Sequence, residues 1–201
     1  MNLSLIKMKH IGLFFGSFNP IHVGHLIIAN HIAEYSEVDE VWMVVTPHNP
    51  HKKKETLLAD HHRYAMVEIA TRDFPKLRPC DIEFKLPQPN YTVNTLAYLT
   101  EKYPEYRFSL IMGTDNLNTF HKWKNYEVIL QNHHIIVYPR TAESTMDNDF
   151  TNHPKVTFID APLMEISSTF IRKAIADKKN VRAYFPETVW NYIDEMNFYK
   201  K

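Results

Sequence analysis

Two histidines near the start of the chain have the clearest potential for chemistry. His22 and His25 lie within residues 16–25, which read Gly-Ser-Phe-Asn-Pro-Ile-His-Val-Gly-His. If a helix begins between the two histidines, both imidazoles face a phosphate bound at the helix N-terminus, where free backbone N–H groups favour anions. The spacing therefore predicts a phosphate-binding turn.

A second set of polar residues lies near the other end of the chain. Ser167, Ser168 and Thr169 precede Arg172 in the sequence Ser-Ser-Thr-Phe-Ile-Arg. The hydroxyls suit the start of a helix, and Arg172 follows Thr169 on the same helical face. We expect hydroxyls, amides and a guanidinium to converge on one anion. Serines before a helix also serve as simple caps, which is the alternative interpretation.

A third candidate begins at Tyr91. Thr92 is a plausible N-cap for a helix running to about Lys102. Unpaired N–H groups beside an aromatic ring suit a flat, negatively charged ring ligand, through stacking and hydrogen bonds to a carboxylate. Helix capping alone explains the same residues equally well.

These residues must be positioned by alternating strands and helices. The apolar runs predict strands at 11–15, 41–46, 78–84, 107–112, 135–138 and 156–159. Helices are expected at 23–33, 60–71, 92–102 and 126–130, and from the serines onward. Strand, helix and strand in succession predict a parallel sheet. We therefore expect an α/β fold with a central parallel sheet flanked by helices, and ligands bound at the carboxyl ends of its strands.

Several segments receive less specific interpretations. In the helix 60–71, the candidates for the buried side are Tyr64, Val67, Ile69 and Ala70. The polar loop 47–54 carries three consecutive lysines, which either reach phosphates or form a solvated basic loop. The stretch 141–154 is expected to be a polar surface loop without chemistry.

Composition limits the class of protein. The 201 residues suit one domain, 1–201, whose C-terminal helical part covers about 167–199. Lys plus Arg and Asp plus Glu are both 23, which argues against a broad electrostatic grip on nucleic acid. The lone cysteine excludes an internal disulfide. Without a membrane-length apolar stretch or a secretory signal in residues 1–9, we expect a soluble, cytoplasmic protein that binds no membrane.

The twelve histidines also invite a metal-site interpretation. Several occur in pairs or near pairs: His48, His51, His61, His62, His133 and His134. Structural zinc sites usually need cysteine ligands or two histidines on one helix face, and neither pattern occurs with a plausible partner set. We therefore expect no protein metal site.

The first turn resembles the signature G-x-F-x-P-x-H-x-G-H of a nucleotidyltransferase superfamily. All six defined positions match: Gly16, Phe18, Pro20, His22, Gly24 and His25. The glycine spacing differs from that of a dinucleotide fingerprint, and the Lys-Ser/Thr ending of a Walker loop is missing. The Ser-Ser-Thr-x-Ile-Arg sequence is similar to the second phosphate-binding element of the same superfamily.

Between these motifs, the chain resembles bacterial nicotinate mononucleotide adenylyltransferases. The resemblance rests on Tyr-Thr-Val-Asn-Thr-Leu at 91–96, on Gly113-x-Asp115-x-Leu117, on Trp123, and on the ending 181–199. Phosphopantetheine adenylyltransferases share the first motif but lack the element at 91–96. One departure is Asn-Pro-His-Lys at 49–52, where the family commonly has two consecutive prolines before His-Lys.

The resemblance implies transfer of AMP from ATP to nicotinate mononucleotide, with release of pyrophosphate, in a Rossmann-like fold. The catalytic residues would be His22, His25 and Arg172. ATP would contact these three and Gly16, Ser17, Phe18, Gly113, Asp115, Arg140, Ile166, Ser167, Ser168 and Thr169. Nicotinate mononucleotide would contact Ser17, Lys52, Tyr91, Thr92, Thr95, Leu117 and Trp123. Mg²⁺ would arrive with ATP and need few protein ligands.

Other functions remain as alternatives. One is an enzyme of the same superfamily that acts on nicotinamide mononucleotide, phosphopantetheine or glycerol phosphate. Another is a catalytically silent nucleotide-binding regulator, although such a protein need not keep His22, His25 and Arg172 for a leaving pyrophosphate. The sequence leaves open whether the chain forms a homo-oligomer.

Overall fold

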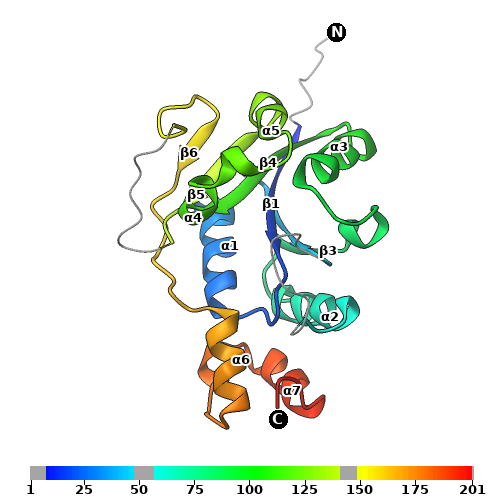
Figure 1. Ribbon diagram of the computed structural model, residues 1–201, viewed down its shortest axis with the longest axis vertical. Helices are drawn as coiled ribbons and strands as arrows, with labels where there is room; N and C mark the ends of the chain where they lie inside the picture. The colour runs from blue at the N-terminus through cyan, green and yellow to red at the C-terminus, as the bar shows by residue number, and fades with distance from the viewer. Residues whose placement is uncertain (1–7, 48–56, 141–148, 201) are drawn as a thin grey trace.

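A six-stranded parallel sheet forms the centre of the computed structural model, which describes residues 8–47, 57–140 and 149–200 (Figure 1). The strands are β1 (Lys9–Gly16), β2 (Glu40–Val45), β3 (Leu77–Cys80), β4 (Tyr106–Gly113), β5 (His134–Tyr138) and β6 (Val156–Phe158). Their order across the sheet is β3-β2-β1-β4-β5-β6. The sheet confirms the predicted α/β class.

The strand order reverses beside β1. The chain runs outward from β1 through β2 to the edge strand β3, then returns to place β4 on the other side of β1. A crevice forms outside the carboxyl ends of two strands where their connections leave in opposite directions, and open α/β sheets bind ligands there. The turn that follows β1 at Gly16 lies at this point.

Helices cover both faces of the sheet. They are α1 (Val23–Tyr35), α2 (Asp60–Thr71), α3 (Thr92–Lys102), α4 (Thr114–Leu117), α5 (Tyr126–Asn132), α6 (Ser168–Ala176) and α7 (Glu187–Glu195). Short 3-10 helices are η1 (Ile82–Lys85), η2 (Phe120–Lys122) and η3 (Arg182–Tyr184). None of the helices in the described ranges is long and apolar enough to cross a membrane.

The alternation of side chains along β1 separates two hydrophobic cores. Phe14 points to the core shared with α1, α2, α6 and α7, whereas Ile11 and Leu13 point to the core shared with α3, α4 and α5. Successive residues of a strand face opposite sides, so a strand buried on both faces is apolar throughout. Figure 1 shows α6 and α7, in orange and red, beyond the carboxyl end of β1.

Two predicted boundaries are wrong. Residues 78–84 form no single strand, because β3 ends at Cys80 and η1 follows. Among the strands that the structure describes, the only neighbour of the edge strand β3 is β2, and the last pair between them is Val44↔Cys80. Because β2 itself ends at Val45, β3 has no described strand to pair with beyond Cys80. Thr92 is the first residue of α3, and Tyr91 is its N-cap without a side-chain hydrogen bond.

Candidate active site

A cavity of about 780 Å³ opens at the carboxyl ends of β1 and β4. Most of the predicted site residues line it: Gly16, Ser17, Phe18, His22, His25, Tyr91, Thr92, Asp115, Trp123, Arg140, Ser167, Ser168, Thr169 and Arg172. They come from segments that lie far apart in the sequence. The topological reversal beside β1 therefore brings the three candidate motifs to a single cavity.

Packing explains the glycine and the phenylalanine of the first turn. Phe18 adopts a left-handed backbone with φ of 43°, and its ring is 1% exposed. A Cβ on Gly16 would lie 2.8 Å from the Cζ atom of this ring, closer than carbon atoms approach. Gly16 therefore leaves room for Phe18 to fold back into the core. The turn is shaped from beneath by this aromatic ring.

The turn then delivers both histidines to the start of α1. His22 is the N-cap and His25 lies in the first turn, as the spacing predicted. Their rings stack with centroids 3.8 Å apart. The backbone N–H of His22 donates to Nδ1 of His25 at 3.3 Å, so the neutral His25 ring carries its proton on Nε2. His25 is thereby prepared to donate a hydrogen bond from Nε2.

His22 is buried and uncharged at neutral pH. Desolvation by burial, together with the positive charge of Arg140, lowers the pKa of His22 to about 4. A Cβ on Gly24 would lie 3.1 Å from Nδ1 of His22, so the glycine makes room for the ring. Nδ1 is buried without a hydrogen-bond partner in the described part of the chain. Only a neutral imidazole tolerates that environment at low cost.

Helix α6 attaches directly to the first turn. The Ser168 hydroxyl donates to the Pro20 carbonyl at 2.9 Å, and Nη1 of Arg172 donates to the Asn19 carbonyl at 2.8 Å. Ser167 is the N-cap, accepting from the backbone N–H of Phe170 at 3.2 Å. Ser167 therefore caps the helix, and both serines line the cavity. Imidazoles, hydroxyls and a guanidinium from two ends of the chain share one rim, where they suit a polyphosphate.

Sequence reasoning missed Arg63, which bonds to the turn through its guanidinium. Its guanidinium is fully buried and donates to the carbonyls of Ser17 at 2.6 Å and Thr46 at 2.8 Å. It also donates to the Leu58 carbonyl at 3.0 Å and pairs with Asp60. One side chain therefore joins the ends of β1 and β2 to the start of α2. One signal could have indicated its burial: Arg63 lies three residues before Met66 and four before Val67, and therefore on the same buried face of α2.

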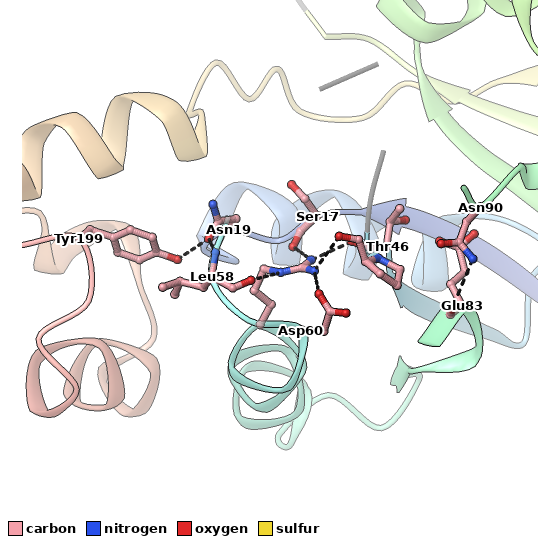
Figure 2. A network of polar contacts seen from close by, with 10 residues as sticks. Ser17, Asn19, Thr46, Leu58, Asp60, Glu83, Asn90 and Tyr199 are labelled. Atoms are coloured by element: carbon pink, nitrogen blue, oxygen red, sulfur yellow. Dashed lines mark hydrogen bonds and ion pairs between the residues drawn. The ribbon is translucent and has the colours of Figure 1, made fainter. Parts of the chain in front are cut away.

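The C-terminal segment also contacts the first turn. The Tyr199 hydroxyl donates to Oδ1 of Asn19 at 2.8 Å, and the backbone N–H of Leu58 donates to the same oxygen at 3.3 Å (Figure 2). Asn19 is 2% exposed. Its side chain is therefore a buried junction between the turn, the chain before α2 and the C-terminus. No periodicity in the sequence indicates this contact.

The other end of the cavity is aromatic and lies at the start of α3. Tyr91, Thr92 and Trp123 line it. Lys124 Nζ lies 4.2 Å above the centroid of the Tyr91 ring. Asp115 lines the wall between this end and the histidines, and a Cβ on Gly113 would lie 2.5 Å from its Oδ1. The N-terminus of an eleven-residue helix beside two aromatic rings suits a planar anion.

Several predicted contacts do not reach the cavity. Thr95 and Leu117 are fully buried, with Thr95 bonded to Glu83 and Leu117 in the core beneath α4. Ile166 packs near Gly24, and Gly113 makes room for a neighbouring side chain rather than lining the wall. These positions follow their motifs in sequence but support the wall from behind. Lys52 lies outside the described residues.

Several lining residues were absent from the predictions. They include Asn19, Thr46, Glu83, Asn90, Lys122, Lys124 and Tyr138. Asn19 occupies an undefined position of the first motif, and Asn90, Lys122 and Lys124 stand next to predicted residues along the chain. Among the described residues, no group of three or more His, Cys, Asp and Glu side chains is placed to hold a metal ion.

Comparison with known proteins gives a consistent assignment. The family model described as cytidylyltransferase-like matches residues 13–174. A probable nicotinate-nucleotide adenylyltransferase of Flavobacterium psychrophilum is 68% identical over 191 residues, which cover 95% of this chain and 99% of the relative. A protein of the same description from Flavobacterium johnsoniae is 62% identical, with the same shares covered.

A solved structure shares the fold. The nicotinic acid mononucleotide adenylyltransferase of Plasmodium falciparum, complexed with NaAD, superimposes with a TM-score of 0.80. The comparison covers 95% of this chain and 97% of the other, at 23% identity. At this identity the likeness extends to the arrangement of the sheet and its helices.

Proposed function

The chain belongs to the nicotinate-nucleotide adenylyltransferases within the cytidylyltransferase-like family, and on that premise we propose that it transfers AMP from ATP to nicotinate mononucleotide. The products are nicotinate adenine dinucleotide and pyrophosphate, in the biosynthesis of NAD. The observation that carries this proposal is the meeting of the turn 16–25 with the start of α6 at one cavity. The Ser168 and Arg172 contacts hold the two elements together.

The reaction needs no protein nucleophile. A 5′-phosphate oxygen of nicotinate mononucleotide attacks the α-phosphorus of ATP, and the bond from that phosphorus to the oxygen bridging to the β-phosphate breaks. Pyrophosphate leaves with that bridging oxygen. Catalysis then consists of positioning the two anions and stabilising charge on the phosphoryl oxygens.

We assign the nucleotide end of the cavity to ATP. His22 and His25 contact the phosphates, with Nε2–H of His25 donating to the α-phosphate, while Ser168, Thr169 and Arg172 hold the β and γ groups. The main-chain atoms of Gly16, Ser17 and Phe18 lie along the nucleotide, Asp115 holds its ribose, and Arg140 flanks adenine. The positive ends of α1 and α6 add to the field at the phosphates.

We assign the aromatic end to the pyridine ring. The nicotinate carboxylate accepts hydrogen bonds from backbone N–H groups at Tyr91 and Thr92, and Trp123 stacks on the ring. Ser17 lies where the phosphate of this substrate meets ATP. Thr95 and Leu117 support this end from behind, and Lys52 is a further phosphate contact in this proposal.

A divalent metal ion accompanies ATP, and we propose Mg²⁺. The ion prefers oxygen ligands and keeps several waters, so phosphate oxygens satisfy most of its coordination. The donors assigned above, imidazole, hydroxyl and guanidinium, suit phosphate oxygens rather than a hard cation. The chain therefore contributes charge neutralisation at the phosphates, and the ion contributes Lewis-acid polarisation of the same groups when bound.

The test is pyrophosphate release from the purified protein with ATP and a panel of acceptors. We expect nicotinate mononucleotide to be the preferred acceptor over the nicotinamide form, because backbone donors reward a carboxylate and are poor partners for an amide N–H₂. Equal kcat/KM for the two acceptors would overturn the assignment of the aromatic end. Turnover with phosphopantetheine alone, or ATP binding without any product, would replace the proposed function.

A further inference from the structure

The aromatic end of the cavity contains a buried carboxyl group with no role in the proposal above. Glu83, in η1, lines the cavity and is 2% exposed. The Thr95 hydroxyl of α3 donates to its Oε1 at 2.8 Å. Among the residues that the structure describes, no lysine, arginine or histidine forms an ion pair with it. A buried carboxylate without a cation is costly, whereas the neutral acid is not.

The charged neighbours of Glu83 are engaged elsewhere. Within its own helix, Lys85 pairs with Asp81 at 3.1 Å. Lys124, which also lines the cavity, lies over the Tyr91 ring. Burial raises the pKa of Glu83, and the hydroxyls of Thr95 and Thr46 only partly oppose that shift. The groups that face this carboxyl are therefore hydroxyls and amides rather than charges.

Two unpartnered atoms in this cluster need a donor. Oε2 of Glu83 and Oδ1 of Asn90 are both buried without a hydrogen-bond partner among the described residues. Nδ2 of Asn90 donates to the Glu83 carbonyl at 3.1 Å, which fixes the amide orientation because a carbonyl can only accept. An ionised Glu83 would leave both Oε2 and Oδ1 as buried acceptors without a hydrogen-bond partner among the described residues. Protonation of Oε2 turns one of these two acceptors into a donor.

From this geometry we infer that Glu83 is a specificity-determining positioning residue that stands as a neutral acid beneath the start of α3. Thr95, which holds its carboxyl, is bonded through its backbone N–H to the Tyr91 carbonyl at 3.2 Å. Glu83 is therefore linked through Thr95 to the first turn of α3, where the N–H groups assigned to the pyridine carboxylate lie. This inference rests on the proposed function. An ionised Glu83 would repel an anionic substrate there, and the neutral acid does not.

The consequence is a pH dependence confined to the acidic substrate. As pH rises through the pKa of Glu83, its ionisation places a negative charge beside the nicotinate carboxylate. The KM for nicotinate mononucleotide is expected to rise about tenfold, while the KM for nicotinamide mononucleotide, whose amide carries no negative charge, is not expected to rise. In Glu83→Gln, which mimics the neutral acid, the KM for nicotinate mononucleotide is expected to be independent of pH.

The experiment measures KM and kcat for both acceptors across about pH 6–9 in wild type, Glu83→Gln and the matched control Glu101→Gln. Glu101 lies on the exposed side of α3, so its variant should retain the wild-type profile. If Glu83→Gln shows the same alkaline rise as wild type, the inference is overturned. It is also overturned if removing the carboxyl lowers the KM for the acid substrate at neutral pH, because Glu83 was then ionised.

A second measurement avoids dependence on folding of the variant or on turnover. In wild-type protein labelled with ¹³C at the glutamate carboxyls, one resonance is expected to remain in the protonated range at neutral pH. That resonance should be absent from the spectrum of Glu83→Gln. If this variant does not fold, the resonance is assigned instead by its shift when nicotinate mononucleotide binds to the wild-type protein. Titration of every glutamate in the ordinary range would overturn the inference. If Glu83 is protonated but the protein turns over no acceptor, the result counts against the proposed function and not against this inference.

Discussion

At the residue scale, His25 has an N–H group that can donate a hydrogen bond to substrate, whereas His22 is a neutral, buried ring that lines the cavity. His25 uses Nδ1 as an acceptor for the His22 backbone N–H, which directs the remaining N–H outward from Nε2. We predict that His25→Ala lowers kcat by about 10²- to 10³-fold, because it removes a donor to charge that develops in the transition state. Steady-state kinetics with ATP and nicotinate mononucleotide measure the loss.

Thermal unfolding is the control for that variant. His25 is only partly buried, so His25→Ala should unfold close to the wild-type temperature. His31→Ala, which changes a partly exposed histidine on the same helix, should retain wild-type kcat. A His25→Ala enzyme with near-normal turnover would contradict the role assigned to this ring.

The lowered pKa of His22, about 4, predicts loss of stability in acid. Between the ordinary histidine value of 6.5 and about 4, the unfolded chain binds a proton on this residue and the folded chain does not. Stability therefore falls as pH is lowered through this window, by up to about 3 kcal/mol from His22 alone. Urea unfolding at several pH values measures it, compared with His22→Gln to subtract the other histidines. Parallel curves for both proteins would show that His22 contributes nothing.

At the element scale, the turn after β1 has its shape because α2, α6 and the C-terminus all bond to it. Arg63 alone contacts the ends of two strands and the start of α2. A buried carbonyl that loses its hydrogen-bond donor remains desolvated without a partner, which destabilises the folded state. The geometry of the turn is thus a property of three elements that are distant in sequence.

We predict that Arg63→Lys destabilises the protein by about 2–4 kcal/mol, because one ammonium cannot reproduce the fork of a guanidinium and leaves buried carbonyls unpaired. Chemical denaturation measures the change. The matched control is Arg78→Lys on β3, whose guanidinium is 53% exposed and contacts Glu40 at 3.5 Å. If the two substitutions cost the same, Arg63 is not the junction described above.

Tyr199→Phe tests the C-terminal contact. The variant removes the hydroxyl that donates to Asn19, and we predict a loss of about 1 kcal/mol in stability together with a higher KM for ATP. The exposed Tyr35 provides the control, since Tyr35→Phe should leave both quantities unchanged. A stability loss without any change in KM would mean that Tyr199 supports the fold but does not position the turn.

At the scale of the whole molecule, the cavity gathers segments from both ends of the chain. A ligand that bridges the turn 16–25 and the start of α6 binds only the folded state. We predict that a non-hydrolysable ATP analogue at a hundredfold excess over its Kd stabilises the protein by about 2.7 kcal/mol. Thermal unfolding with and without the analogue measures it. Arg172→Ala should lose most of this gain in stability. Arg182→Ala, which changes an exposed arginine, should keep it. The opposite result would contradict the proposed position of the triphosphate beside Arg172.

Local pattern was sufficient to predict the main elements and the two segments, 16–25 and 167–172, that meet at the cavity. The strands flanking the reversal are buried on both faces, so their apolar runs are unambiguous. The stacking of His22 on His25 and the room that Gly24 leaves for the His22 ring are both contacts within a few residues. The boundary of β3 was not predictable, because it depends on where β2 ends. The parallel direction of the strands followed from the alternation of strands and helices along the chain.

What the sequence by itself determined is the fold class, the family resemblance and the segments 16–25 and 167–172 proposed to bind phosphate, since each follows from spacing along a single strand, turn or helix. Only the tertiary structure decided that Arg63 and Tyr199 bond to the turn after β1, that Glu83 lines the cavity, and that the Thr95 hydroxyl bonds to the Glu83 carboxyl. Hydrogen bonds and burial between residues dozens of positions apart depend on how the layers pack, and that packing leaves no period in the chain.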